Sequence, residues 1–264
     1  MEFHTFVICA YGESPYLEAC IRSLLSQTEK SRILCATSTP GPWLRRLLDR
    51  YQIPLYVREG EPGIAADWNF AAGLADSRFV TLAHQDDRYS RHYVEELKKA
   101  YRRWPDMTVF TTDCAVEKNG RLQRPGAMEL VKKLLRMPLR LAGLADRTWV
   151  KMGALRFGNP IICPSCAYRT DRLPAPPFDG RFRFVLDWDC MTRLALRPGR
   201  FVCAERPLLC YRVHAGAATS ACIRDHSREK EEREMFARFW PAWAADLLMR
   251  FYRLAYRQYD RTEG

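Results

Sequence analysis

The sequence predicts an α/β domain with an open, mostly parallel sheet and helices on both faces. Three observations predict this fold: strands alternate with helices through the first half, the strands are short apolar runs, and 47% of the 264 residues are hydrophobic. Continuous apolar runs are typical of strands that are buried on both faces, and strand–helix alternation is typical of parallel sheets. A chain of this length can bury one large core.

The first half supplies the regular elements in order. Apolar runs predict strands at residues 7–10, 33–36, 55–57, 79–83 and 108–112. Amphipathic spacing predicts helices between them, at residues 15–27, 43–51, 64–75 and 90–103. Ser14 followed by Pro15 is typical of a helix start. Ligands bind at the carboxyl ends of strands in such sheets, where residues 11–13 and 84–87 fall.

The second half is less regular. Strands are expected at residues 161–168, 201–204 and 208–213, and helices at 187–197 and from 227 nearly to the end, with a break around Pro241. Residues 128–144 are basic and amphipathic and are interrupted by Pro138. We therefore divide the chain into a catalytic domain, residues 1–222, and a helical extension, residues 223–264, which packs on the domain or lies at a membrane surface.

Charge and composition limit the partners and the compartment. The net charge of +11 suits an anionic partner such as a nucleoside diphosphate, a phospholipid surface or nucleic acid. The beginning of the sequence does not resemble a signal peptide, and no run approaches the ~20 apolar residues of a membrane span. The ten cysteines are scattered, which is typical of reduced thiols. These features predict a cytoplasmic protein.

Two adjacent carboxylates, Asp86 and Asp87, follow the fourth predicted strand. Carboxylate oxygens at a strand end suit Mg²⁺ or Mn²⁺ bound between the protein and a diphosphate. Such a cation would neutralise the charge on a departing nucleoside diphosphate. The alternative is a polar turn in which both aspartates only begin the next helix.

These segments resemble the family 2 glycosyltransferases of the GT-A fold, over about residues 4 to 220. The resemblance is carried by residues 6–28, 67–69 and 84–87. Tyr11-Gly12 and Gln27-Thr28 are similar to the family's first loop and the end of its first helix. His84 stands where the family often has the first aspartate of its metal motif. The resemblance implies an open mixed sheet, an inverting mechanism, a nucleotide-sugar donor, and Mn²⁺ or Mg²⁺.

The resemblance also implies roles for single residues in the donor site. Ala10, Tyr11 and Glu13 would line the base pocket, and Asp67 would lie near the nucleoside. Asp86 would lie near the ribose or the metal, and Asp87 would bind the metal. The family usually has an aspartate after the second strand, where this chain has residues 37–39, Thr-Ser-Thr. The nucleotide therefore stays open among UDP, dTDP and GDP, with UDP expected.

A candidate base precedes the helix at residues 187–197. Asp187 matches the family aspartate that takes the proton of the acceptor hydroxyl, and Trp188 and Ser165 would line the donor or acceptor pocket. The alternative for Asp187 is a helix cap, since carboxylates favour that end of a helix. Asp189 is expected to be structural.

Residues 211–214 form a Tyr-Arg-Val-His segment that resembles another family motif. His214 would complete the metal shell or touch the diphosphate, and Arg212 would bind a phosphate with its planar guanidinium. The alternatives are a structural histidine at a strand end and a surface ion pair. Cys163 and Cys166 form a Cys-x-x-Cys pair, but without a second close pair or a helix start they favour neither zinc nor redox chemistry.

The sequence thus predicts an inverting transferase that moves a sugar from a nucleotide sugar, expected to be UDP-linked, to a hydroxyl of a glycan or lipid-linked acceptor in surface polysaccharide synthesis. Basic amphipathic stretches at residues 130–141 and 240–257 either pack on the catalytic domain with their arginines outward or make peripheral contact with the inner face of a membrane. The alternatives are a metal-dependent nucleotidyltransferase, a catalytically silent family member, and a basic nucleic-acid-binding protein. No nucleic acid is expected as a partner of the transferase.

Overall fold

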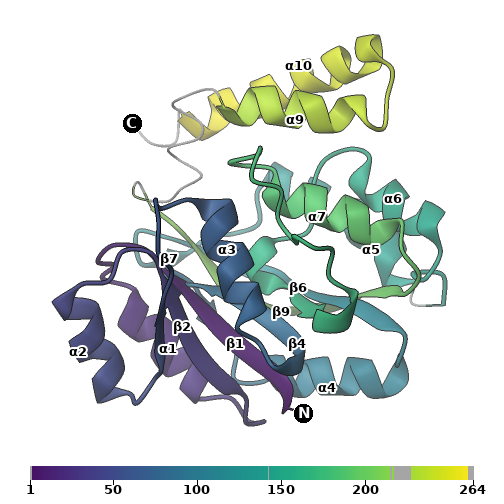
Figure 1. Cartoon of the computed structure of the whole chain (residues 1–264). Coiled ribbons are helices and arrows are strands. Elements are labelled where there is room, and N and C mark those ends of the chain that lie inside the picture. The colour runs from purple at the N-terminus through teal and green to yellow at the C-terminus, as the bar shows by residue number, and fades with distance from the viewer. Residues whose placement is uncertain (1, 142, 215, 217–226, 261–264) are drawn as a thin grey trace.

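The computed structural model describes residues 2–141, 143–214, 216 and 227–260. Within these residues the chain forms a nine-stranded sheet of order β3-β2-β1-β4-β8-β6-β9-β5, with β7 paired to β6 (Figure 1). The strands are β1 (Glu2–Ala10), β2 (Arg32–Thr37), β3 (Leu55–Val57), β4 (Ser77–His84), β5 (Arg88–Tyr89), β6 (Met107–Lys118), β7 (Arg121–Leu122), β8 (Ala167–Arg169) and β9 (Arg200–Val213).

Helices cover both faces of this sheet, as the sequence predicts (Figure 1). They are α1 (Leu17–Leu25), α2 (Pro42–Arg50), α3 (Ile64–Gly73), α4 (Tyr93–Arg103), α5 (Ala127–Arg140), α6 (Thr148–Leu155), α7 (Leu186–Ala195), α9 (Ser227–Ala237) and α10 (Ala242–Asp260). Buried residues of α1, α2 and α4 form the core on one face, and those of α3, α6, α7 and α9 form the core on the other.

Strand β1 contributes side chains to the hydrophobic cores on both faces of the sheet. Phe6 and Ile8 lie in the core with α1, α2 and α4, while Val7 between them lies in the opposite core. Successive side chains of a strand point to opposite faces, so a strand that is covered on both sides must be apolar throughout. The apolar run at residues 7–10 therefore predicted a central strand correctly.

The sheet is mixed rather than mostly parallel. The four strands β1, β2, β3 and β4 are parallel to their neighbours among these four, and β6 also pairs in parallel with β9. The short strand β8 lies between β4 and β6 and is antiparallel to both. The strands β5 and β7 also pair in antiparallel fashion. The mixed sheet agrees with the GT-A resemblance and corrects the expectation from strand–helix alternation alone.

Two predicted strand segments take a different form. The strand expected at residues 161–168 begins as a short 3-10 turn, because the Ser165 and Cys166 N–H groups donate to the carbonyls of Ile162 and Cys163. Only β8 joins the sheet there. The two strands expected at residues 201–213 are one strand, β9, whose register with β6 shifts near Pro207. Proline lacks an N–H, so the ladder is interrupted without ending the strand.

The helices α9 and α10 pack on the rest of the molecule near α7 (Figure 1). Trp240 Nε1 donates to the Arg156 carbonyl at 2.7 Å, and Tyr252 Oη donates to the Phe157 carbonyl at 2.7 Å. The break around Pro241 is confirmed, and α5 continues through Pro138 to Arg140. The boundary predicted at residue 222 lies outside the described residues. No helix among the described residues is long and apolar enough to cross a membrane.

Candidate active site

The loops after β1 and β4 lie side by side at one edge of the sheet. The two strands pair in parallel up to Cys9 and His84, so their next residues meet. The Tyr11 N–H donates to Gln85 Oε1 at 3.1 Å, and Gln85 Nε2 donates to the Tyr11 carbonyl at 2.9 Å. These two hydrogen bonds, the Gln85 clamp, hold the loop after β1 against the loop after β4. The first loop is the one predicted to line the base pocket, and the second carries Asp86 and Asp87.

Asp86 is bound from two sides. Ser14 Oγ, just ahead of α1, donates to Asp86 Oδ1 at 2.6 Å. His214 Nε2 lies 3.1 Å from Asp86 Oδ2, and both side chains keep about a fifth of their surface exposed, 20% and 24%. The structure thus brings together two residues that are 128 positions apart and were both predicted to bind metal. The rest of the His214 motif, at residues 215 and 217–220, lies outside the described residues.

Asp87 is buried, with 2% of its surface exposed. The Arg212 backbone N–H donates to its Oδ1 at 2.9 Å, whereas its Oδ2 is buried and has no hydrogen-bond partner among the residues that the structure describes. Burial raises the pKa of Asp87 to about 8. An unpartnered buried carboxylate oxygen is costly, and a bound cation is one common way to satisfy it.

Arg212 is held by protein groups. Its Nε donates to Glu117 Oε1 at 2.8 Å, one of its terminal nitrogens donates to the Asp86 carbonyl at 2.7 Å, and its guanidinium lies 4.3 Å from the Tyr16 ring centre. Its side chain is 10% exposed. The ion pair considered as an alternative is present, with Glu117, but it is mostly buried and not at the surface. In this arrangement the guanidinium positions the acidic loop, and a contact with phosphate stays a prediction.

These residues suit a divalent cation by the chemistry of their donors. Asp87 offers an unpartnered oxygen, and the Asp86–His214 pair offers a carboxylate and an imidazole. Within the described residues no three such side chains converge on one point. Mg²⁺ and similar ions are commonly held by one or two carboxylates together with phosphate oxygens of the substrate, so two or three protein ligands are enough.

The residues predicted for the nucleoside line the same edge. Ala10 is buried at the end of β1, while Tyr11, with 62% of its surface exposed, and Glu13 face solvent. Asp67 accepts hydrogen bonds from Arg58 Nε at 2.6 Å and Ser38 Oγ at 3.0 Å. Ser38 belongs to the segment that replaces the family's usual aspartate, and here it is joined to Asp67. Sequence reasoning missed Ser14, Ser38, Arg58 and Gln85 because each acts through contacts between distant segments.

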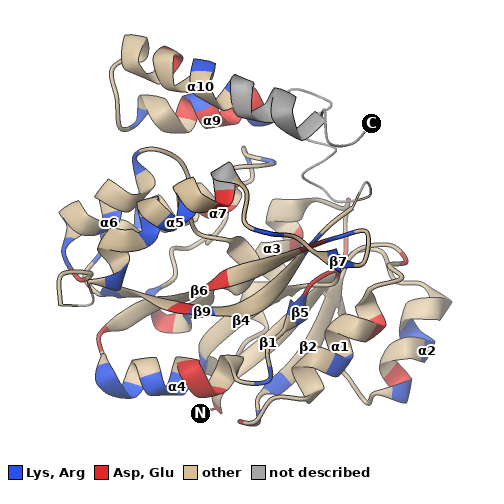
Figure 2. Cartoon of the chain, turned by 180° about the vertical axis from the view of Figure 1, so that it is seen from behind, with Lys and Arg blue, Asp and Glu red and all other residues tan. Residues whose placement is uncertain are grey.

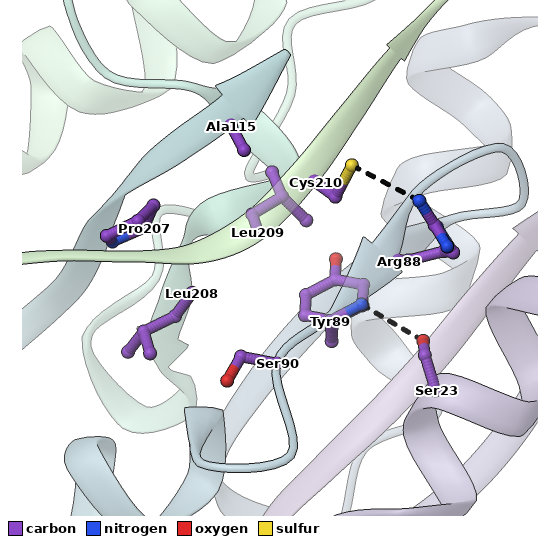
Figure 3. A pocket seen from close by; sticks show the side chains of 9 residues that line it. All are labelled: Ser23, Arg88, Tyr89, Ser90, Ala115, Pro207, Leu208, Leu209 and Cys210. Atoms are coloured by element: carbon purple, nitrogen blue, oxygen red, sulfur yellow. Dashed lines mark hydrogen bonds between the residues drawn. The ribbon is translucent and has the colours of Figure 1, made fainter. Parts of the chain in front are cut away.

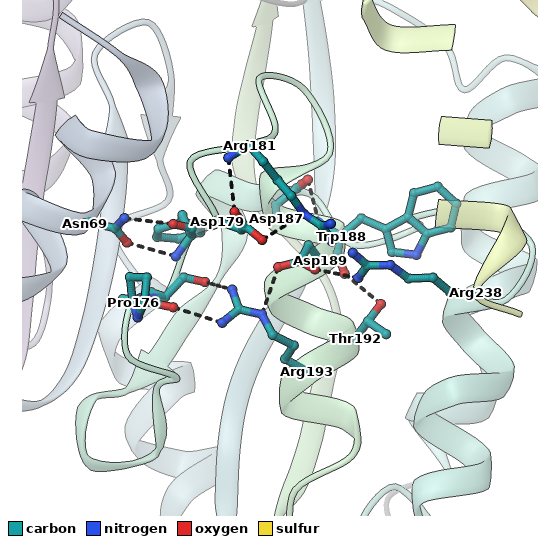
Figure 4. A network of polar contacts seen from close by, with 12 residues as sticks. Asn69, Pro176, Asp179, Arg181, Asp187, Trp188, Asp189, Thr192, Arg193 and Arg238 are labelled. Atoms are coloured by element: carbon teal, nitrogen blue, oxygen red, sulfur yellow. Dashed lines mark hydrogen bonds and ion pairs between the residues drawn. The ribbon is translucent and has the colours of Figure 1, made fainter. Parts of the chain in front are cut away.

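Asp187 lies in the first turn of α7, half-buried. The Trp188 N–H donates to its Oδ1 at 2.8 Å (Figure 4). Asn159 Nδ2 donates to its Oδ2 at 2.9 Å. Burial raises the pKa of Asp187 to about 6, although these hydrogen bonds and the charge of Lys132 oppose the shift. A carboxylate with a pKa near neutrality suits general-base chemistry.

The predicted pocket residues Ser165 and Trp188 lie in the core instead. Ser165 is fully buried, and its Oγ donates to the Ile162 carbonyl at 2.6 Å. Trp188 is 2% exposed, and its Nε1 donates to the Leu155 carbonyl at 3.1 Å. Both polar groups are thus used internally, so the structure places neither side chain on an open pocket wall. The apolar surroundings that bury them are not evident from sequence spacing.

Ion pairs, hydrogen bonds and ring contacts hold α7 and the segment before it in place. Asp189 is buried and accepts from Arg193 at 2.8 Å and from Arg238, which follows α9, at 2.6 Å (Figure 4). These contacts agree with the structural role expected for Asp189. Asn69 of α3 donates to the Phe178 carbonyl at 2.8 Å and accepts from the Phe178 N–H at 2.9 Å. The Trp68 ring lies 5.0 Å from the His84 ring and 5.1 Å from the Phe178 ring. This chain of contacts joins the acidic loop to the segment before α7.

A separate hollow lies over β5 and β9 (Figure 3). Tyr89 donates its N–H to Ser23 Oγ at 3.0 Å there, and Arg88 donates to Cys210 Sγ at 3.7 Å. None of the predicted site residues lines this hollow. We therefore place the candidate site at the Tyr11 and Asp86 loops and not in this hollow.

Comparisons with known proteins agree with this fold. The model of the Glycosyl transferase family 2 matches residues 5–162, more than half of the chain. No curated protein matches the sequence. S. aureus TarS 1-349 in complex with UDP-GlcNAc is similar in structure, with a TM-score of 0.63 and 15% sequence identity, over 94% of this chain and 70% of that chain.

Two further solved structures share the fold. The mannosyltransferase PcManGT from Pyrobaculum calidifontis, in complex with GDP-Man and Mn²⁺, gives a TM-score of 0.62 at 14% identity, over 93% of this chain and 69% of that chain. Glucosyl-3-phosphoglycerate synthase from Mycobacterium tuberculosis, in complex with Mn²⁺, UDP and glucosyl-3-phosphoglycerate, gives 0.56 at 14% identity, over 86% and 77%. At these identities the likeness shows the fold.

A mixed sheet of this kind gives the chain the GT-A fold of these solved glycosyltransferases. The chain belongs to glycosyl transferase family 2, whose model covers the segment from β1 to the Cys163 turn. This membership decides against the nucleotidyltransferase and the nucleic-acid-binding protein that composition left open.

Proposed function

We propose that the protein is an inverting transferase that takes a sugar from a UDP-sugar with the help of Mn²⁺ or Mg²⁺. The acceptor is a hydroxyl of a glycan or lipid-linked molecule in surface polysaccharide synthesis, presented at the inner face of a membrane. The observation that carries the proposal is the acidic loop. The unpartnered Asp87 oxygen and the Asp86–His214 pair lie directly beside the loop that contains Tyr11.

Each proposed donor contact follows from these positions. The exposed Tyr11 ring offers a face for the base, with Ala10 and Glu13 beside it. Asp67, fixed by Ser38 and Arg58, lies near the nucleoside. Asp86, Asp87 and His214 would hold the cation, which supplies positive charge to the departing diphosphate. Arg212 keeps the acidic loop in place through its contacts with Glu117 and the Asp86 carbonyl.

Asp187 serves as the base of the transfer step. A sugar hydroxyl is a weak nucleophile, so its proton must leave as its oxygen bonds to the anomeric carbon. The Asp187 carboxylate receives that proton, while the bond between the anomeric carbon and the diphosphate breaks on the opposite side. The hydrogen bond from Asn159 fixes the Oδ2 atom, and burial keeps the carboxylate basic enough to accept a proton near neutral pH.

Calorimetric titration of UDP with and without Mn²⁺ tests the proposal. We expect binding that is at least tenfold tighter with Mn²⁺, because the cation joins the carboxylates to the diphosphate. Titrations of dTDP and GDP under the same conditions serve as controls for the base. Failure of all three nucleotides to bind would contradict the donor site, and binding that is indifferent to Mn²⁺ would contradict the metal site.

A further inference from the structure

Helix α5 places two arginines on its inner side, beside the buried Leu139, which is unusual for a surface helix. Arg136, with 4% of its surface exposed, donates to Asp113 Oδ1 of β6 at 2.7 Å, and Arg140 donates to both Asp113 oxygens at 3.0 and 2.9 Å. Arg136 also donates to the Pro160 carbonyl. Two arginines thus hold the helix to the sheet from its inner side. A surface helix normally turns its charges to water and its leucines to the core.

The outer side of the same helix is apolar. Four large side chains at spacings of four, three and four residues share one exposed stripe, and we name them the α5 apolar face: Leu130 (58% exposed), Leu134 (62%), Met137 (53%) and Leu141 (62%). This spacing places them on one side of a helix. Val131, 48% exposed, lies beside the stripe. An exposed contiguous apolar stripe of this kind marks a surface that binds a partner.

Basic residues surround this face. Residues 118–149 contain eight Lys and Arg residues, but Arg136 and Arg140 pair with Asp113 on the inner side of the helix. The other six, against two Asp and Glu residues, give this segment a net charge of 6 − 2 = +4. Lys133, Arg121, Arg124 and Arg147 are exposed, and Trp149 next to them is 68% exposed. Figure 2 shows Lys and Arg along α5 and in the segment leading to α6. Apolar side chains within a basic border are typical of a helix that lies on an anionic membrane.

We propose that the α5 apolar face docks the enzyme on an anionic lipid surface. A second copy of this chain fits the face less well, because a symmetric pair would bring two segments of net positive charge together. Anionic headgroups instead attract the basic border, while the leucines and Met137 enter the boundary between headgroups and acyl chains.

The position of α5 connects this surface with the proposed base. Lys132, one residue from the exposed Val131 and Lys133, is near enough to Asp187 for its charge to act on that carboxylate. One side of α5 therefore carries the α5 apolar face, and a different side of the helix faces the proposed base, Asp187. A lipid-linked acceptor held at that membrane would meet the same helix whose Lys132 acts on Asp187, a consequence that rests on the proposed function.

Cosedimentation with vesicles tests the docking surface. The full chain is mixed, without donor, with vesicles of phosphatidylcholine alone or of equal phosphatidylcholine and phosphatidylglycerol. We expect binding to the anionic vesicles only, weakened by added salt. Changing Leu130→Gln together with Leu134→Gln should lower the partition constant at least tenfold, because two apolar contacts with the lipid are lost.

The matched control is Leu25→Gln together with Leu196→Gln, two leucines that are 50% and 61% exposed outside this segment. We expect this pair to bind vesicles like the parent, with thermal unfolding confirming that all variants fold. Equal binding by parent and Leu130/Leu134 variant, or no binding by the parent, would overturn the proposal. The proposal would also be overturned if the parent formed a dimer and the Leu130/Leu134 variant, but not the control variant, were monomeric. Because no donor is present, failure here is distinct from failure of UDP binding.

Discussion

The carboxylate of Glu231 on α9 accepts the backbone N–H of Val185, the residue from which α7 begins, at 3.1 Å. It also accepts the N–H groups of Arg183 at 2.9 Å and Phe184 at 2.7 Å. Glu231 is buried, with 8% of its surface exposed. One side chain from the C-terminal helices thus satisfies three consecutive backbone N–H groups, that of Val185, which caps α7, and those of the two residues before it.

This relationship predicts that Glu231→Gln impairs catalysis from a distance. An amide has one acceptor oxygen, so the backbone before Asp187 loses part of its support. We expect kcat to fall roughly tenfold or more, with UDP affinity unchanged. The free energy of unfolding should fall by about 1–3 kcal/mol. Steady-state kinetics, UDP calorimetry and urea unfolding measure the three quantities.

Glu234→Gln is the control on the same helix, because Glu234 is exposed and forms a surface ion pair with Arg181 at 3.4 Å. Its kinetics should equal those of the parent. Equal losses of kcat in both variants would contradict the positioning role, as would a Glu231→Gln variant that transfers sugar at the parent rate.

The pH dependence of transfer tests Asp187. Because its pKa is raised to about 6 and the ionised form is the base, kcat/KM should rise with pH through about 6 and be lost below it. Asp187→Asn should lower kcat by roughly 10²–10⁴ and remove this acid limb. The exposed Asp179 supplies the control, since Asp179→Asn should keep both rate and profile. A variant at Asp187 with the parent profile would remove it from the role of base.

Asp87→Asn should uncouple nucleotide binding from the cation. The amide cannot offer a charged oxygen to Mn²⁺, so we expect the gain in UDP affinity on adding Mn²⁺ to shrink at least tenfold. Binding without Mn²⁺ should change little. Asp76→Asn, which alters a carboxylate in the turn before β4, should leave the Mn²⁺ effect intact. A full Mn²⁺ effect in Asp87→Asn would show that the cation binds elsewhere.

Buried His4 predicts a loss of stability in acid. Its ring nitrogens lie 2.7 Å from Ser31 Oγ and 2.9 Å from Thr81 Oγ1, and burial lowers its pKa to about 3. The unfolded chain, with a histidine pKa near 6.5, then binds more protons, so stability is present above 6.5 and falls as pH falls below it. Between pH 7 and pH 5 this residue alone should cost about 2 kcal/mol.

Urea unfolding at both pH values measures this loss. His4→Gln should be less stable than the parent at pH 7 but should show a smaller decrease at pH 5. The partly exposed His92, which pairs with Glu95, provides the comparison, and His92→Gln should keep the parent's pH dependence. An unchanged pH dependence in His4→Gln would contradict the assignment.

Local pattern was sufficient for much of the fold. Residues 7–10 and 79–83 are continuous apolar runs, and that property alone identifies strands covered on both faces. The β8 region could not be predicted in this way. Whether residues 161–168 extend or turn depends on Ile162 and Cys163 carbonyls accepting nearby N–H groups, a choice that the apolar composition leaves open.

The residues of the candidate site could also be predicted from the sequence only in part. The acidic pair was evident because strand ends carry function in this kind of sheet, and residues 86 and 87 follow one directly. The contacts that fix it, from Ser14, His214 and Arg212, join segments more than 70 positions apart. For Trp188 the sequence predicted a role that its contacts do not support. Its place in the motif suggested a pocket wall, but its contacts place it in the core.

The clamp between Gln85 and the Tyr11 backbone has a consequence for the rate of donor capture. Two hydrogen bonds already hold the loop in one conformation, so the loop has little backbone entropy left to lose when a nucleotide arrives. The pocket edge is a pre-assembled surface. Encounter with the donor is then governed by diffusion and by the electrostatic attraction of a polyanion to a protein of charge +11, so association should slow steeply as ionic strength rises.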